Sequence, residues 1–139
     1  MSVSQIVVQL GFAAAMFMAG ANKVTDAISP EMHAQLALQL DVMAKAPWGF
    51  LGLSGETFRL AIGYTEVVCA ICCILPGKLR LVALHLITII LVAAAGSHVY
   101  HKDGMWQPAA VLGGLAVGQL VQLKRAKKAA LGIGKKKAN

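Results

Sequence analysis

The sequence predicts an all-α integral membrane protein: a four-helix bundle with a short amphipathic interfacial helix between the first and second spans. Of its 139 residues, 58% are hydrophobic and only 14% are charged, and the mean hydropathy is +0.68. An ordinary soluble domain is roughly half apolar and about a quarter charged. Apolar runs near the roughly 20 residues that cross a bilayer recur along the chain, separated by polar turns. These observations favour one membrane domain.

We expect the first spanning helix at about residues 4–22, because the chain carries no charged side chain before Lys23. The run ends in Ala19-Gly20-Ala21, a small-residue pattern that also occurs at signal-peptidase sites. A signal peptide has a basic region ahead of its apolar core, and none is present here. We therefore interpret the segment as a retained transmembrane helix.

A polar connection follows and contains a short helix. Ser29 is a good capping residue, Pro30 suits the first helical position and Glu31 lies in the first turn. Apolar residues then recur at helical spacing (Met32, Leu36, Leu40 and Met43). The pattern stops at Ala46-Pro47. Such a helix is expected to lie at the membrane interface or across the end of the bundle.

Three more spanning helices are predicted at about residues 56–75, 79–100 and 105–123. Pro76-Gly77 separates the second span from the third, and His101-Lys102-Asp103-Gly104 separates the third from the fourth. Residues 1–125 then form the transmembrane domain, and residues 126–139 form a basic tail.

The distribution of basic residues predicts the topology. Seven of the thirteen Lys and Arg residues fall within the last sixteen positions. Four crossings place both termini on one side, and an excess of Lys and Arg marks the cytosolic or matrix side. In a soluble protein a net charge of +7 would suggest nucleic acid. Here we expect the lipid bilayer and other integral membrane proteins as partners, and no nucleic acid.

Glu66 lies near the middle of the second span, where a carboxylate is costly unless it is protonated, paired or hydrogen-bonded. Counting depth at about 1.5 Å per residue places it near His85 and Gln119, so we predict a buried polar cluster of these three residues. Lys23 lies near the opposite end of the first span and would have to extend along its stem to meet Glu66. Glu66 either binds a proton, a quinone or a partner's polar group, or it is a structural hydrogen-bonding residue.

Cys69, Cys72 and Cys73 lie within the same span. A redox thiol pair needs a depressed pKa and access to a partner, which an apolar interior disfavours, so we interpret them as packing residues. His98 and His101 have a spacing that suits two metal ligands, but a site generally needs a third or fourth. We predict no catalytic residue, no metal and no cofactor, with a quinone expected only under a redox alternative.

The fourth span contains Gly114-x-x-x-Gly118, and Ala110 extends this stripe of small residues. Small residues let helix backbones approach closely in a membrane. The approaching helix can belong to this chain or to another protein.

Several short motifs, in order, resemble those of DoxX-like membrane proteins. They are Phe17-Met18-Ala19-Gly20-Ala21-Asn22-Lys23-Val24-Thr25, Pro30-Glu31-Met32-His33, Gly63-Tyr64-Thr65-Glu66-Val67-Val68-Cys69 and Leu75-Pro76-Gly77. Within that group the chain is most similar to the acetylcholine receptor chaperone family of the endoplasmic reticulum, over about residues 10–104. Lys23, Gly63 and Glu66 are the motif residues.

The resemblance implies a four-helix bundle with an assembly or accessory role and no defined catalytic site. Relatives in the broader group are associated with quinone-linked sulfur or thiol chemistry, which is the alternative function. Lys136 and Lys137 stand fourth and third from the C-terminus and resemble a dilysine retrieval signal. A polybasic segment attracted to anionic lipid is the other interpretation. We expect the endoplasmic reticulum, or the mitochondrial inner membrane if the chain is a subunit of a complex there.

Overall fold

Five α-helices and one short 3-10 helix make up the part of the chain that the structure describes. The computed structural model describes residues 3–136, with side chains described through residue 129. The elements are α1 (Val3–Val24), α2 (Pro30–Lys45), η1 (Trp48–Leu51), α3 (Gly55–Ile74), α4 (Lys78–His101) and α5 (Trp106–Lys136). The predicted all-α class is therefore confirmed, and the predicted ends of α3 and α4 differ from the observed ones by one residue.

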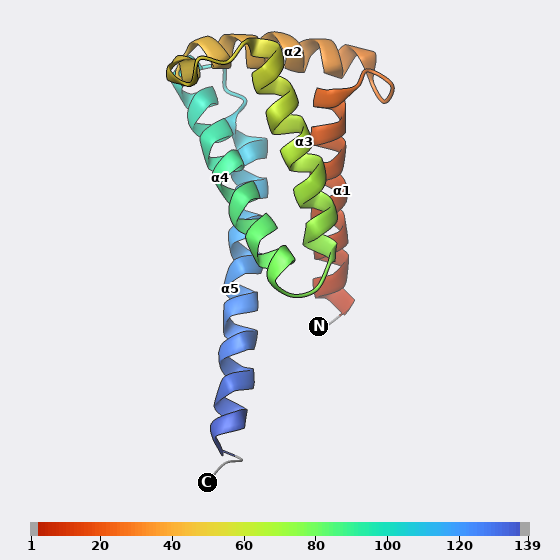
Figure 1. The fold of residues 1–139 in the computed structure, drawn as a ribbon, viewed down its shortest axis with the longest axis vertical. Helices are drawn as coiled ribbons and strands as arrows, with labels where there is room; N and C mark the ends of the chain where they lie inside the picture. The colour runs from red at the N-terminus through yellow and green to blue at the C-terminus, as the bar shows by residue number, and fades with distance from the viewer. Residues whose placement is uncertain (1–2, 137–139) are drawn as a thin grey trace.

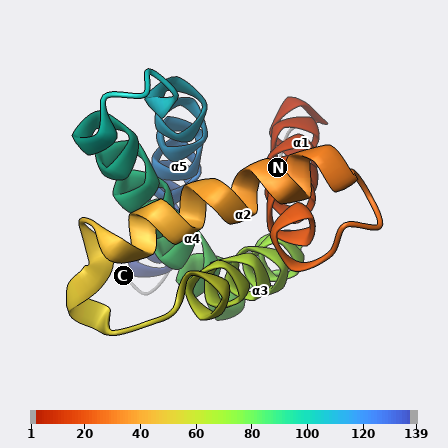
Figure 2. The ribbon, with the colours of Figure 1, turned by 90° about the horizontal axis from the view of Figure 1, so that it is seen from above.

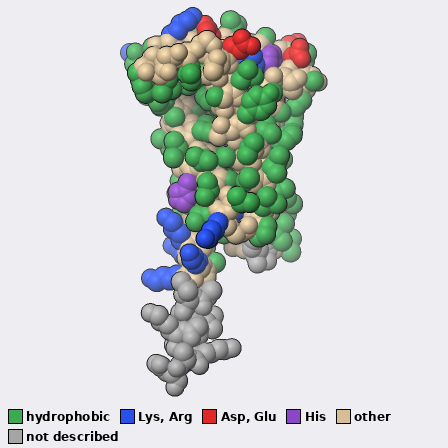
Figure 3. Space-filling model, in the orientation of Figure 1, with side chains coloured by type: hydrophobic (Ala, Val, Ile, Leu, Met, Phe, Trp, Pro, Cys, Tyr) green, Lys and Arg blue, Asp and Glu red, His purple; other side chains and the backbone are tan. Residues whose placement is uncertain are grey.

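Three of the helices, α1, α3 and α4, are long and apolar enough to cross a membrane. In the view of Figure 3, apolar side chains cover most of the middle of the molecule, and the charged side chains gather at the two ends. This distribution indicates contact with a lipid bilayer. A membrane crossing by α5, and with it a bundle of four spans, remains a prediction.

The four long helices lie roughly side by side, and α2 crosses one end of them (Figure 1). The most extensive contacts join α1 to α3 and α4 to α5, and α3 also packs on α4. All four long helices contribute buried side chains to one apolar core (Phe12, Ala13, Met16, Cys69, Ala70, Cys73, Ala83, Leu84, Ile87, Leu91, Ala116 and Leu120).

Helix α2 begins as the sequence predicts, with the Ser29 hydroxyl accepting a hydrogen bond from the Met32 backbone N–H. Seen from above in Figure 2, it lies across the ends of the long helices. Its buried residues Leu40, Met43 and Ala44 form a second small core with Phe58 of α3. An interfacial position of α2 in a membrane stays a prediction.

The chain after α2 is tied to α4 by two hydrogen bonds. Trp48 Nε1 donates to Ser97 Oγ at 2.8 Å, and His101 Nε2 donates to the Ala46 carbonyl at 2.7 Å. These contacts hold the connection between α2 and α3 against the last turns of α4.

Helix α5 runs without interruption from Trp106 to Lys136, a length of about 46 Å at 1.5 Å per residue. Its far part extends beyond the other helices, at the same end as the start of α1 (Figure 1). The predicted boundary between a membrane domain and a tail near residue 125 therefore coincides with no break in the helix. The exposed Lys124 and Arg125 lie on this extension.

Candidate functional site

Helices α1 and α3 cross very closely inside the molecule, and two glycines lie at the crossing. A Cβ added at Gly20 would lie 2.7 Å from the Gly63 carbonyl oxygen, and one added at Gly63 would lie 2.8 Å from the Lys23 Cβ. These separations are too short for any side chain, and the neighbouring atoms are partly backbone. Glycine is therefore required at both positions for the two helices to approach this closely.

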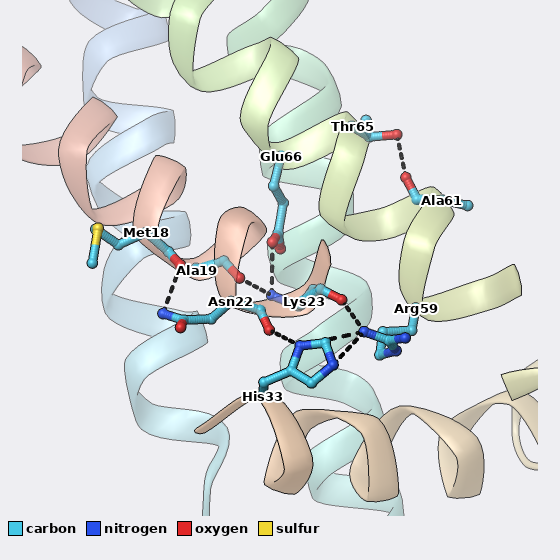
Figure 4. Close-up of polar contacts among 9 residues, drawn as sticks. All are labelled: Met18, Ala19, Asn22, Lys23, His33, Arg59, Ala61, Thr65 and Glu66. Atoms are coloured by element: carbon cyan, nitrogen blue, oxygen red, sulfur yellow. Dashed lines mark hydrogen bonds and ion pairs between the residues drawn. The ribbon is translucent and has the colours of Figure 1, made fainter. Parts of the chain in front are cut away.

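An ion pair lies directly beside this crossing. Lys23 Nζ of α1 is 2.7 Å from Glu66 Oε2 of α3, and their side chains are only 12% and 5% exposed. The same ammonium group donates to the Ala19 carbonyl at 3.3 Å, as Figure 4 shows. Each charge is therefore compensated within the chain, which a buried charge requires.

The end of α1 is completed by side chains from two other helices (Figure 4). His33 Nδ1 of α2 donates to the Asn22 carbonyl at 2.8 Å, and Arg59 Nη1 of α3 donates to the Lys23 carbonyl. Arg59 Nη1 also donates to His33 Nε2 at 3.2 Å, which suits the tautomer with hydrogen on Nδ1. The last carbonyls of a helix lack partners within it, so these donors satisfy them.

A repeated sequence pattern explains why the charges meet. Gly20-x-x-Lys23 in α1 and Gly63-x-x-Glu66 in α3 share one spacing, with opposite charges. Residues three apart lie on one helix face, so antiparallel helices that touch at their glycines bring the lysine next to the glutamate. The matched spacing and opposite charges of the two motifs are the signal in the sequence that points to this pairing.

The predicted cluster of Glu66, His85 and Gln119 is wrong. Glu66 is buried and pairs with Lys23, whereas His85 is exposed and donates through Nδ1 to the Leu81 carbonyl of its own helix. Gln119 is buried next to Arg80, whose Nη2 donates to Gln119 Oε1 at 3.4 Å.

The depth count failed for a geometric reason. It measured Glu66, His85 and Gln119 from the basic ends of their own spans and placed Lys23 near the opposite end of the first span. In the structure, α3 begins nearer to α2 than α1 ends (Figure 1). Lys23 consequently lies beside Gly63, one turn from Glu66. Depth also carries no information about which way a side chain faces, and His85 faces away from the core.

The other candidates from the sequence lie apart from this site. Cys69 and Cys73 are buried in the apolar core, while Cys72 is partly buried. His98 Nδ1 donates to Asp103 Oδ2 at 2.7 Å. Among the described residues, no group of three or more His, Cys, Asp or Glu side chains is arranged to hold a metal ion.

The small-residue stripe of α5 faces outward. Ala110, Gly114 and Gly118 are all exposed, and a Cβ added at either glycine would meet no atom within 4 Å. Gly113, one position away, is buried against Leu91 of α4. The stripe therefore makes no close contact with the described part of the chain, although Gly114 and Gly118 border a cavity that α1 and α4 also line. Of the two tail lysines, Lys136 is the last residue of α5, and Lys137 lies outside the described residues.

No protein-family model matches the chain, and no curated protein is detectably similar to it. Its class is therefore defined by its own geometry. It is an all-helical protein with three helices apolar enough to cross a membrane and a buried ion pair between two of them.

Proposed function

We propose that this chain is a non-enzymatic membrane protein that binds another integral membrane protein. It would act as an assembly factor of the chaperone kind or as an accessory subunit of a larger complex. The observation that carries the proposal is the outward-facing stripe of Ala110, Gly114 and Gly118 on α5.

Small residues aligned on one face give a helix partner the close approach that drives association in lipid, where apolar surfaces alone supply little. Within this chain the device is used at the crossing of Gly20 and Gly63. On α5, a Cβ added at Gly114 or Gly118 would have no described atom within 4 Å, so no helix in the described part of the chain packs closely on these glycines. A helix of a second protein, seated along this stripe, would gain the packing that α1 and α3 gain from each other.

The ion pair has a structural role in this proposal. Lys23 and Glu66 neutralise each other inside the chain, and neither residue lines the cavity that Gly114 and Gly118 border. Their pairing supports a rigid scaffold that presents α5, so loss of Glu66 would weaken partner binding only through loss of the fold.

We expect the end that carries Lys78, Lys124 and Arg125 to face the cytosol or the mitochondrial matrix. The exposed Glu31 and Glu56 belong to the opposite end, where α2 lies. An excess of Lys and Arg on one side supports this orientation. The endoplasmic reticulum is the proposed membrane, with the mitochondrial inner membrane as the alternative.

The test is co-purification in a mild detergent, with native mass spectrometry of the eluate. Replacing both Gly114 and Gly118 by leucine is expected to lower recovery of the partner protein about tenfold, the equivalent of about 1.4 kcal/mol of helix packing. The fold should be retained, since a Cβ added at either glycine meets no described atom within 4 Å. Detection of a dimer of this chain that the variant abolishes would identify the partner as a second copy.

Gly11→Leu is the matched control. Gly11 is also an exposed helical glycine with no atom within 4 Å of an added Cβ, but it lies on α1. This variant should retain the partner. Equal recovery from the wild type and the double variant would refute partner binding through this face.

A further inference from the structure

A surface cavity of about 240 Å³ opens between α1, α4 and α5, at the basic end of the molecule. The volume is somewhat below that of ordinary small-molecule pockets, which start at about 300 Å³. It therefore suits a headgroup rather than a whole large ligand. The lining consists of Ser4, Gln5, Val8, Arg80, Gly114, Leu115, Gly118, Gln119 and Gln122.

The lining is positively charged and rich in side-chain donors. Arg80 is the one charged residue among these nine. Its guanidinium carries five N–H donors; Nη2 donates to Gln119 Oε1, and the residue makes a further interaction within the chain. Both side chains are largely withdrawn from solvent, at 9% exposure for Arg80 and 5% for Gln119. Such a set of donors suits a ligand that only accepts hydrogen bonds.

Gln119 supplies an independent sign that a ligand belongs here. Its Oε1 accepts from Arg80, but its buried Nε2 has no hydrogen-bond partner in the part of the chain that the structure describes. A buried N–H without a partner carries a desolvation cost that a bound acceptor would remove. An anionic oxygen bound near Arg80 would satisfy this amide.

The position of the cavity identifies the kind of anion. Arg80 is the third residue of α4, Ser4 and Gln5 open α1, and the exposed Lys124 and Arg125 follow on α5. The start of α1 and the extension of α5 lie at the same end of the molecule (Figure 1), and basic side chains gather below its apolar middle in Figure 3. Two lining residues, Val8 and Leu115, are apolar and exposed. Polar and apolar walls in one cavity at this end match an amphiphile.

We propose that this cavity binds the phosphate headgroup of an anionic phospholipid from the leaflet at the basic end. Arg80 and the amide of Gln119 donate to the phosphate oxygens, and an acyl chain lies along Val8 and Leu115. Phosphate is well matched to a guanidinium because both can engage in paired hydrogen bonds. This lipid site goes beyond the proposed protein partner and requires none.

The test uses the purified full-length chain alone, in nanodiscs of phosphatidylcholine that contain a small fraction of spin-labelled lipid. Labelled phosphatidylglycerol is expected to bind about tenfold more tightly than labelled phosphatidylcholine, the typical size of a charge-assisted contact. Arg80→Gln should reduce this preference to about twofold. Arg125→Gln, which removes an exposed charge of the same kind, should keep most of it.

Gln119→Leu is the second variant, because it keeps the charge and removes the unpartnered amide. It should weaken the preference several-fold, and it covers the case in which Arg80→Gln fails to fold. Arg80 and Gln119 lie outside the partner face, so these variants separate the lipid site from the proposed function even though Gly114 and Gly118 border both.

Three results would overturn the lipid site. The preference could be unchanged in Arg80→Gln and in Gln119→Leu. It could fall equally in Arg125→Gln, which would indicate diffuse attraction to the basic end. Finally, millimolar inorganic phosphate could displace the labelled lipid completely, which would indicate a site for a free anion.

Discussion

Two pairs of helical glycines in this chain differ in what surrounds them. Gly20 and Gly63 meet at the crossing of α1 and α3, where even a methyl group would collide with backbone. Gly114 and Gly118 have the same small size and helical setting, yet nothing lies within 4 Å of an added Cβ. Glycine makes a close helix approach possible in both places, but within the described chain only Gly20 and Gly63 have a helix neighbour at that distance.

The difference lies in what accompanies the glycines. Gly20 and Gly63 are each followed three residues later by a charge, Lys23 and Glu66, and these charges neutralise each other when the helices meet. The α5 stripe has no such charge at the corresponding position, because Val117 and Val121 follow the glycines. The contact between α1 and α3 pairs two charges that would otherwise be buried alone. The α5 stripe carries no charge, so it leaves no buried charge unpaired when no helix of the chain packs closely on it.

The largest expected effect comes from breaking the ion pair. Lys23→Met should destabilise the fold by about 3–5 kcal/mol, because it leaves a buried carboxylate without its partner. Unfolding of the detergent-solubilised protein by denaturant measures the change. The double variant Lys23→Met with Glu66→Leu should recover most of the lost stability. Equal losses in the single and double variants would mean that the pair is not the reason for the cost.

The next effect comes from the glycine crossing itself. Gly20→Ala should cost about 1–3 kcal/mol, since its methyl group would lie 2.7 Å from the Gly63 carbonyl and force the helices apart. Gly114→Ala, compared by the same unfolding measurement, should be neutral or slightly stabilising through better helix propensity. Equal changes in the free energy of unfolding for Gly20→Ala and Gly114→Ala would show that the close contact at Gly20 carries no special cost.

A smaller effect is expected at the end of α1. Arg59→Met removes the donor to the Lys23 carbonyl and to His33, so about 1–2 kcal/mol of stability should be lost. Hydrogen exchange should increase mainly in the last turn of α1 and the first turn of α2. Uniform exchange across all helices would argue that Arg59 supports the whole fold rather than this helix end.

The smallest effect concerns the turn between α4 and α5. Hydrogen bonds from His98 and from the Met105 N–H hold the pKa of Asp103 below its ordinary value. A lowered pKa contributes stability above the unfolded value of about 3.9 and loses it as pH falls through the folded value. The melting temperature of the wild type should therefore exceed that of Asp103→Asn at pH 7, and the difference should shrink below about pH 4. A difference that stayed constant with pH would exclude this linkage.

The sequence by itself determined the apolar character of the spans, the positions of α1, α3 and α4 and the capping of α2, because these depend on local composition and spacing. The predicted end of the last helix near residue 123 was wrong, since α5 continues to Lys136. The Gly-x-x-Lys and Gly-x-x-Glu motifs were also visible, although their pairing was not predicted. Only the tertiary structure decided that Lys23 rather than His85 meets Glu66, and that Gly114 and Gly118 face outward. Both outcomes depend on the offset and rotation of one helix relative to another, which packing across the core sets. The matched spacing of the two motifs points to the pairing of Lys23 with Glu66, but it does not fix the offset of α3 or the direction in which α5 faces.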